Sequence, residues 1–156
     1  MSVWPVAELV PHAGDMILID EVLAFGAEHI DTRLVVRPDG LFSQADGSLP
    51  ATVGIELMAQ SVAAFAGCHA REQGLPVELG FLLGTRNFVC NVDRFPAGTT
   101  LHIHATRSLQ DDNGMCVFEC RLEGPDILVE ARLNVFQPRD VTTYIQESPI
   151  SQEPSA

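Results

Sequence analysis

The sequence predicts an α+β domain in which an antiparallel sheet wraps one long central helix. Residues 51–72 contain no internal proline and follow Ser48 and Pro50, which together are typical of a helix start. Two strand candidates precede this segment and four follow it, so the helix lies between two runs of strands. An antiparallel sheet that covers a buried helix satisfies that order.

The predicted helix is apolar on every side, which indicates that it is buried. Its apolar side chains surround the axis instead of forming one stripe: Val53, Ile55, Leu57, Met58, Val62, Ala63 and Phe65. Only the last turn, with His69, Arg71 and Glu72, has the polar character of a solvated surface. Gly74 and Pro76 then end the helix.

The strand candidates are short apolar runs separated by turn residues. They span residues 16–25, 29–36, 79–90, 100–109, 115–122 and 127–136. Gly26 suits a hairpin turn between the first two, and Asp-Asn-Gly at 112–114 and Gly-Pro-Asp at 124–126 separate the last three. Residues 37–50 form a loop rich in Pro, Gly and Asp, and residues 6–10 can form about one helical turn.

Most of the chain is predicted to form one domain over residues 1–138, followed by a loose polar tail over residues 139–156. With 156 residues, 46% hydrophobic and 19% charged, the chain is neither a disordered protein nor a coiled coil. No run reaches the roughly 18 apolar residues of a membrane span. The first residues lack the basic stretch and apolar core of a signal peptide, so we expect a cytoplasmic protein.

The charge pattern excludes several functions. Nine basic residues oppose twenty-one acidic ones for a net charge of −12, and all nine basic residues are Arg. Without lysine there is no Schiff-base or lysine-nucleophile chemistry. The acidic balance argues against a nucleic-acid partner, because nucleic-acid affinity comes mainly from basic side chains on phosphates.

The Cys, His and Ser residues give no strong sign of a metal site or a hydrolase nucleophile. The four Cys form no CxxC pair, and Cys116 and Cys120 lack nearby His, so we expect small buried hydrophobic side chains. His102 and His104 alternate on one strand face, a spacing that can bind a metal. No third ligand is evident, however, so a polar sheet face is favoured. No serine lies in a G-x-S-x-G context, which argues against a serine hydrolase.

Glu56 is the most informative residue, because it places a carboxyl group in the middle of an apolar helix. A carboxylate there is costly unless it is paired or neutralised. Burial favours the neutral carboxyl, the form that a general acid at neutral pH needs. Gln60 lies four residues later on the same face, where it can orient the carboxyl or a ligand carbonyl. The alternative is structural: Glu56 forms an internal ion pair, for instance with Arg86, or caps a neighbouring backbone segment.

Several motifs, in this order, resemble those of the bacterial β-hydroxyacyl-ACP dehydratases. The matching segments are Pro-His at 11–12, Met-Ile-Leu-Ile-Asp-Glu-Val at 16–22, the proline at 50, Ile-Glu-Leu-Met-Ala-Gln at 55–60, Phe-Leu-Leu-Gly at 81–84 and Phe-Pro-Ala-Gly-Thr at 95–99. The run at 55–60 is similar to the I-E-A-[ML]-A-Q run of the family's central helix. The closer resemblance is to the predicted dehydratases of aryl-polyene pigment clusters, in which a variable loop ends in Leu-Pro before this helix.

This resemblance implies the hotdog fold, an antiparallel sheet wrapped around a long helix. It also implies removal of water from a (3R)-3-hydroxyacyl thioester to give the trans-2-enoyl thioester. In the family, a His removes the α-proton while a carboxylic acid on the helix protonates the departing hydroxyl. The resemblance implies that Glu56 is this acid and that Gln60 is a positioning residue.

One departure from the family concerns the catalytic His. Typical members carry it in a G-H-F-P-G loop, fourteen residues before the helix glutamate. Here residues 44–50 read Gln-Ala-Asp-Gly-Ser-Leu-Pro and contain no His. His12 is the candidate within this chain to replace it, although its counterpart in the family looks structural. The family's site is shared between two subunits, so a partner chain can also supply the missing base.

The resemblance also suggests where the substrate binds. Helix N-terminal N–H groups near Val53 and Gly54 are candidates to hold the thioester carbonyl, because unpaired amides favour developing negative charge. The candidates for the wall of an acyl tunnel are Phe65, Phe81, Leu83 and Phe88. The substrate is expected on acyl carrier protein, attached through its phosphopantetheine arm, in fatty-acid-like or polyene synthesis. No metal or redox cofactor is implied.

Two alternatives to a self-sufficient dehydratase stay open. The first is a hotdog acyl thioesterase, in which a helix carboxylate activates water. The second is a non-catalytic or half-site subunit of a heteromeric dehydratase, which the missing loop His favours. In each case we expect at least a dimer, either a homodimer or a heterodimer with another hotdog dehydratase. The long strand predicted at residues 79–90 is the candidate edge for pairing, since an unpaired apolar strand invites aggregation.

Overall fold

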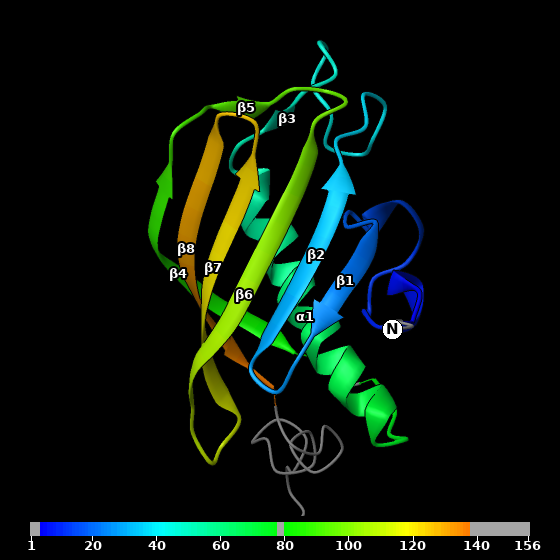
Figure 1. Cartoon of the computed structure of the whole chain (residues 1–156), viewed down its shortest axis with the longest axis vertical. Helices are drawn as coiled ribbons and strands as arrows, with labels where there is room; N and C mark the ends of the chain where they lie inside the picture. The colour runs from blue at the N-terminus through cyan, green and yellow to red at the C-terminus, as the bar shows by residue number, and fades with distance from the viewer. Residues whose placement is uncertain (1–3, 78–79, 138–156) are drawn as a thin grey trace, which may run out of the picture.

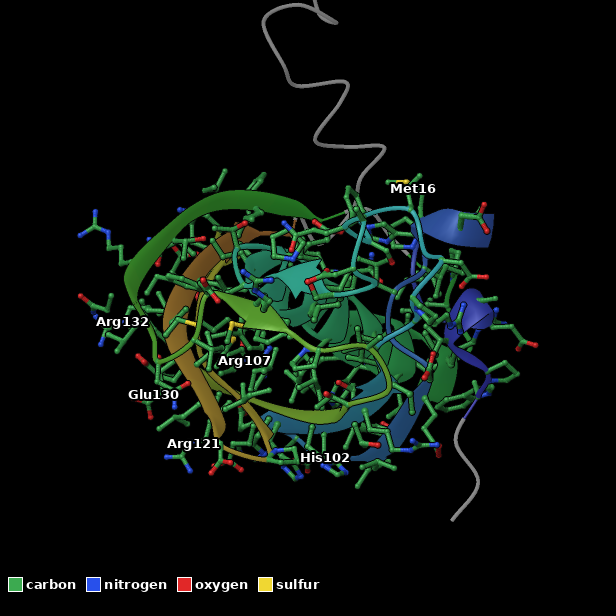
Figure 2. The ribbon with its side chains drawn as sticks, turned by 90° about the horizontal axis from the view of Figure 1, so that it is seen from above. Met16, His102, Arg107, Arg121, Glu130 and Arg132 are labelled. Atoms are coloured by element: carbon green, nitrogen blue, oxygen red, sulfur yellow. The ribbon has the colours of Figure 1, made fainter. Side chains whose placement is uncertain are left out.

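The computed structural model describes residues 4–77 and 80–137, and it has the predicted α+β architecture. A six-stranded antiparallel sheet, in the order β1-β2-β6-β7-β8-β4, packs on the long helix α1 (Figure 1). Figure 2 shows from above how the sheet curves around this helix. The elements are the 3-10 helices Val6–Glu8 and Gly14–Met16, the helix α1 (Val53–Glu72), and the strands β1 (Glu21–Phe25), β2 (His29–Val35), β3 (Leu49–Pro50), β4 (Phe81–Cys90), β5 (Arg94–Phe95), β6 (Thr100–Gln110), β7 (Met115–Gly124) and β8 (Ile127–Phe136).

The order of the strands in space makes β1 and β4 the two edges of the sheet. The strands β6, β7 and β8 follow one another as antiparallel neighbours, and β2 pairs with β6. The strand β4 comes before them in the chain yet lies outside β8, with Thr85 opposite Leu133. Its register shifts twice, between Leu82 and Gly84 and between Arg86 and Val89. The edge strand is therefore long but irregular.

The inner face of α1 supplies one half of the core. Leu57, Met58 and Cys68 have no exposed surface, and Phe65 packs edge-on against Phe118 of β7, with ring centroids 5.5 Å apart. Alternate residues of β7 and β8 are buried, as expected for a sheet with one face on the core. Full burial of each large apolar side chain stabilises the fold by about 1.5–3 kcal/mol.

One face of α1 is only half-buried, so the prediction that this helix is buried on every side is wrong for that face. Glu56, Ala59, Ala63 and Ala66 recur along it at helical spacing and are partly exposed. Three of these four side chains are alanines, which leave space beside the helix. Among the described residues, no helix is both long and apolar enough to cross a membrane.

The first predicted strand, residues 16–25, is wrong in its first half. Residues 14–16 form a 3-10 helix and β1 begins only at Glu21. The reason is that Met16 and Leu18 use backbone groups to bond the side chain of Gln60 instead of a neighbouring strand. The short pair β3–β5, which joins the loop before α1 to the segment after β4, was not predicted. The predicted tail over residues 139–156 lies outside the described residues.

Gly67 lies where α1 comes closest to the N-terminal segment. A Cβ at this position would lie 2.1 Å from the carbonyl oxygen of Leu9, a backbone atom. We expect Gly67→Ala to lower the free energy of unfolding by about 1–3 kcal/mol, because backbone must move to relieve the overlap. Urea unfolding followed by circular dichroism measures this.

Gly54, in the same helix, provides the matched control. Its added Cβ would meet Phe95 at 3.5 Å, an ordinary contact. Gly54→Ala should leave stability unchanged or raise it by up to about 1 kcal/mol through helix propensity. Equal effects of the two substitutions would contradict the close approach of Leu9.

Candidate active site

Glu56 lies in the first turn of α1, where its carboxyl group meets two other polar side chains. Nε2 of Gln60 donates a hydrogen bond to Oε2 of Glu56 over 3.0 Å. Nε2 of His12 lies 3.3 Å from the same oxygen. The Glu56 side chain is 39% exposed in the single chain, so the deeply buried carboxyl that we expected is not observed. Among the described residues, the ion-pair partner of Glu56 is His12 and not Arg86, the partner named in the structural alternative.

Gln60 is fully buried and connects the helix to the N-terminal segment. Its Nε2 donates to the Met16 carbonyl over 2.7 Å, and its Oε1 accepts from the Leu18 N–H over 2.8 Å. One amide side chain thus replaces the strand that residues 16–18 lack. Because the same amide also bonds Glu56, it sets the position of the carboxyl and of the segment that follows His12.

His12 follows Pro11, between the two 3-10 helices, and it reaches Glu56 from outside α1. Its other ring nitrogen, Nδ1, is the only buried side-chain nitrogen or oxygen among the described residues without a hydrogen-bond partner. Oε2 of Glu56 thus accepts one hydrogen bond, from Gln60, and lies within ion-pair distance of His12.

Glu56 and His12 line a largely apolar cavity of about 210 Å³. Its walls come from α1, from β8 and from the start of β4: Ala59, Val62, Ala63, Ala66, Gly80, Leu82, Val135 and Phe136. From Glu56 to Ala66 the helix rises by about 15 Å, so the alanine face gives an extended path for an unbranched apolar chain. The site therefore combines a carboxyl group with a narrow apolar space.

The loop before α1 does not bring a base to this cavity. Counting fourteen residues back from Glu56 gives Phe42, which is 39% exposed and lines a different hollow beside Ile17 and Arg37. The loop is held in place by Asp46, which accepts a hydrogen bond from the Ser48 N–H over 3.0 Å and pairs with Arg94 over 2.9 Å. Hydrogen bonds from Ser48 and Arg94 lower the pKa of Asp46 to about 2.

The structure separates several of the predicted substrate-binding residues from Glu56. Phe65 faces the core and carries the guanidinium of Arg107 5.4 Å from its ring centroid, so it does not line the cavity. Val53 begins α1 and does not line it either. The N–H of Gly54 donates to the Ala51 carbonyl over 2.9 Å, so this amide is not unpaired as a carbonyl-binding group requires.

The predicted tunnel residues on β4 also differ in position. The backbone of Phe81 begins β4 opposite Phe136. Leu83 is 56% exposed, and Phe88 packs against the core. The residues that prediction missed are Ala59, Ala63 and Ala66. Their signal in the sequence is the three- and four-residue spacing from Glu56, which places small side chains on the face of the carboxyl.

Other reactive groups are distant from this cavity or shielded. Burial raises the pKa of the Cys68 and Cys120 thiols to about 12, so both stay protonated at neutral pH. His102 and His104 lie on the outer face of the sheet, where Nδ1 of His104 bonds Asp31 over 2.6 Å. No group of three His, Cys, Asp or Glu in the described part of the chain could hold a metal ion.

Comparison with known proteins identifies the class of fold. The structure is similar to the dehydratase heterocomplex ApeI:P from Xenorhabdus doucetiae, with 31% identity and a TM-score of 0.83 over 94% of this chain and 100% of that chain. It is also similar to a hypothetical thioesterase from Streptococcus pneumoniae TIGR4 solved with coenzyme A (14% identity, TM-score 0.58, 77% and 90% covered). A third similar structure is a sigma28-regulated virulence protein from Campylobacter jejuni (10% identity, TM-score 0.61, 86% and 96% covered). These likenesses define a hotdog fold.

The family is narrower than the fold. The sequence model of the ApeP-like dehydratases matches residues 4–146. The chain therefore belongs to the ApeP-like dehydratase family, in agreement with the resemblance seen in its motifs. No curated protein matches the chain by sequence.

The role of Gln60 in holding residues 16–18 can be tested by Gln60→Leu. This change keeps the apolar volume but leaves the Met16 carbonyl and the Leu18 N–H without their partner. We expect a loss of about 2–4 kcal/mol in the free energy of unfolding, since each unsatisfied backbone group costs about 1–3 kcal/mol. Chemical denaturation measures the loss.

Ser61→Ala is the control for Gln60→Leu. Ser61 is equally buried; its hydroxyl bonds the Thr32 hydroxyl over 2.8 Å and donates to the Leu57 carbonyl of its own helix over 2.9 Å, so it holds no other backbone segment. We expect it to cost only about 1 kcal/mol. If Gln60→Leu costs no more than this control, the amide is not what holds the N-terminal segment.

Proposed function

We propose that this chain takes part in the dehydration of (3R)-3-hydroxyacyl chains carried on acyl carrier protein, giving the trans-2-enoyl thioester. The pathway would be fatty-acid-like or polyene synthesis in the cytoplasm. The observation that carries the proposal is the Glu56 carboxyl at the mouth of an apolar cavity, in a chain of a dehydratase family. The family supplies the reaction class, and the cavity supports an apolar acyl chain as the part of the substrate that binds.

The proposed chemistry needs two groups that touch different atoms of the substrate. A base removes a proton from the α-carbon, the electron pair forms the new double bond, and the β-hydroxyl leaves with a proton as water. Glu56 is the proposed acid that delivers this last proton. His12 contacts Glu56 itself, so we assign it the orientation of the carboxyl rather than the removal of the α-proton. Gln60 is the second positioning residue.

The base is proposed to come from a second hotdog subunit that completes the site. Two observations support this: no His lies in the loop before α1, and the matching position, Phe42, lies outside the cavity of Glu56. The similar structure from Xenorhabdus doucetiae is itself described as a heterocomplex. Pairing through the edge strand β4 would bring the partner close to the cavity, because Leu82 of β4 lines it.

A thioesterase is the second candidate, and one observation favours it. The Glu56 carboxyl is 39% exposed and has both of its described polar contacts, with Gln60 and His12, on Oε2, which leaves Oε1 free among the described contacts to activate a water molecule. Such an enzyme would release free carrier thiol from an acyl thioester. The dehydratase would instead release no thiol and would form the conjugated enoyl thioester, which absorbs in the ultraviolet.

Glu56→Gln tests the proposed acid. The amide keeps the shape of the side chain but cannot deliver a proton, so we expect turnover to fall by roughly 10²–10⁴-fold with the fold retained. The assay follows enoyl thioester and free thiol from a 3-hydroxyacyl carrier protein. It is run with the chain alone and in complex with its partner subunit.

Glu72→Gln serves as the control, because Glu72 is exposed at the other end of α1. It should leave turnover unchanged. Unchanged dehydration by folded Glu56→Gln protein would remove Glu56 from the mechanism. Thiol release without enoyl product would instead identify the thioesterase.

His12→Asn separates orientation of Glu56 from catalysis by His12. Loss of the contact that orients the Glu56 carboxyl should lower turnover only about ten-fold, because the proposed acid stays in place. If His12 is itself the base, turnover should fall as far as in Glu56→Gln. That result would overturn the positioning role of His12.

A further inference from the structure

The edge strand β4 exposes both apolar and charged side chains. Leu82, Leu83 and Val89 are 43%, 56% and 63% exposed. An apolar edge strand with unpaired backbone groups is a template for pairing with another chain. Since the proposed shared site needs a partner near the cavity, the chemistry of this edge bears on which partner it accepts.

Arg86 differs from the other Arg side chains that the structure describes. Seven of the eight Arg side chains within the described residues lie within ion-pair distance of a carboxylate: Arg33, Arg37, Arg71, Arg94, Arg107, Arg121 and Arg132. Arg86 is exposed, and no described carboxylate lies within this distance of it. Within residues 4–77 and 80–137, Arg86 is thus the one Arg without an ion pair, in a chain whose net charge is −12.

The neighbourhood of Arg86 makes a new anionic partner favourable. Arg86 lies directly opposite Arg132 of β8, and directly opposed residues of an antiparallel pair lie on the same face of the sheet. Arg132 points outward from the sheet (Figure 2) and is already paired with Glu119 over 2.8 Å. Across the sheet the order is therefore Glu119, Arg132, Arg86, so two cations lie side by side and the carboxylate is on the side away from the β4 edge.

Pairing of two copies through β4 would add a third and a fourth cation. The strand runs from Phe81 to Cys90, so Arg86 lies at its middle. A two-fold axis perpendicular to the sheet joins the two copies into one continuous sheet, and the outer faces of both copies then lie on the same side of it. If the two-fold axis passes near the middle of β4, Arg86 of one copy lies either directly opposite Arg86 of the other copy or diagonally across from it. Like charges at these distances destabilise the pair, whereas opposite charges stabilise it.

We propose that the β4 edge selects a different hotdog subunit over a second copy of this chain. The selected subunit would present a carboxylate opposite Arg86. This inference rests on the shared site of the proposed function and adds the chemistry of the partner to it. Repulsion between the Arg86 side chains of two copies disfavours self-pairing, while the apolar side chains of β4 stay available to the partner.

Arg86→Glu turns the chain into the partner that the proposal describes. Wild type and Arg86→Glu are measured alone and mixed in equal amounts, by sedimentation equilibrium and by native mass spectrometry. We expect the mixed dimer to be at least about five-fold tighter than either homodimer, because one Arg–Glu contact replaces a like-charge contact. The preference should weaken at high salt. Arg86→Gln, which removes the charge alone, should let the variant self-associate more tightly than wild type.

Arg71→Glu is the matched control, since Arg71 is an exposed Arg at the far end of α1 and the substitution changes the net charge equally. Its mixture with wild type should show no preference for the mixed dimer. A mixed Arg86→Glu dimer no tighter than the homodimers overturns the proposal, whether all samples stay monomeric or all dimerise alike. The readout is association, so failure here leaves the role of Glu56 intact. Loss of turnover with normal pairing would instead concern the proposed function.

Discussion

The buried amide of Gln60 is the interaction on which the candidate site depends. Residues 16–18 have no neighbouring strand, so their backbone groups need another partner before they can be buried. Gln60 provides both a donor and an acceptor, and its remaining N–H reaches Glu56. The segment that carries His12 is thereby fixed against α1 by the same group that orients the carboxyl. A polar group of this kind is retained only when every donor and acceptor is satisfied.

The incomplete wrapping of α1 explains why the site lies where it does. The sheet covers the inner face of the helix with large apolar side chains, but the face with Glu56 and the alanines is only half-buried. A carboxyl group on the inner face would need a buried partner, at a high cost in desolvation. On the half-buried face it keeps access to solvent and still borders an apolar space. In the dimer that we propose, the partner would cover this face.

Much of the fold could be predicted from the sequence, because the signals for strands and helix are local. The strand Ile127–Phe136 has the predicted bounds, and α1 begins two residues later than predicted. The pair β3–β5 escaped prediction since two-residue strands have no alternation to detect. The first half of the strand predicted at 16–25 failed for a different reason. Its backbone bonds go to a side chain forty-two residues away along the sequence, which no local pattern reveals.

The sequence predicts the polar residues of the candidate site, Glu56, Gln60 and His12, but not the walls of the cavity that two of them line. Glu56 and Gln60 stand out because polar groups in an apolar helix require an explanation, and His12 follows from the motif resemblance. Aromatic residues such as Phe65 were natural choices for a tunnel, yet a large side chain is also the best filler of a core. In the structure Phe65 fills the core, and the part of α1 that borders the cavity carries mainly alanines instead. The size of a side chain indicates burial but does not say on which side of a helix the space lies.

The alanine face of α1 has a thermodynamic consequence for whatever enters the cavity. A helix backbone is already ordered by its own hydrogen bonds, and alanine has no rotamers left to restrict. Ala59, Ala63 and Ala66 can therefore be covered by a ligand without loss of side-chain entropy in the protein, so the ordering cost falls on the ligand. Entry is driven by release of water from this apolar, inflexible surface, and a negative heat-capacity change is its calorimetric mark.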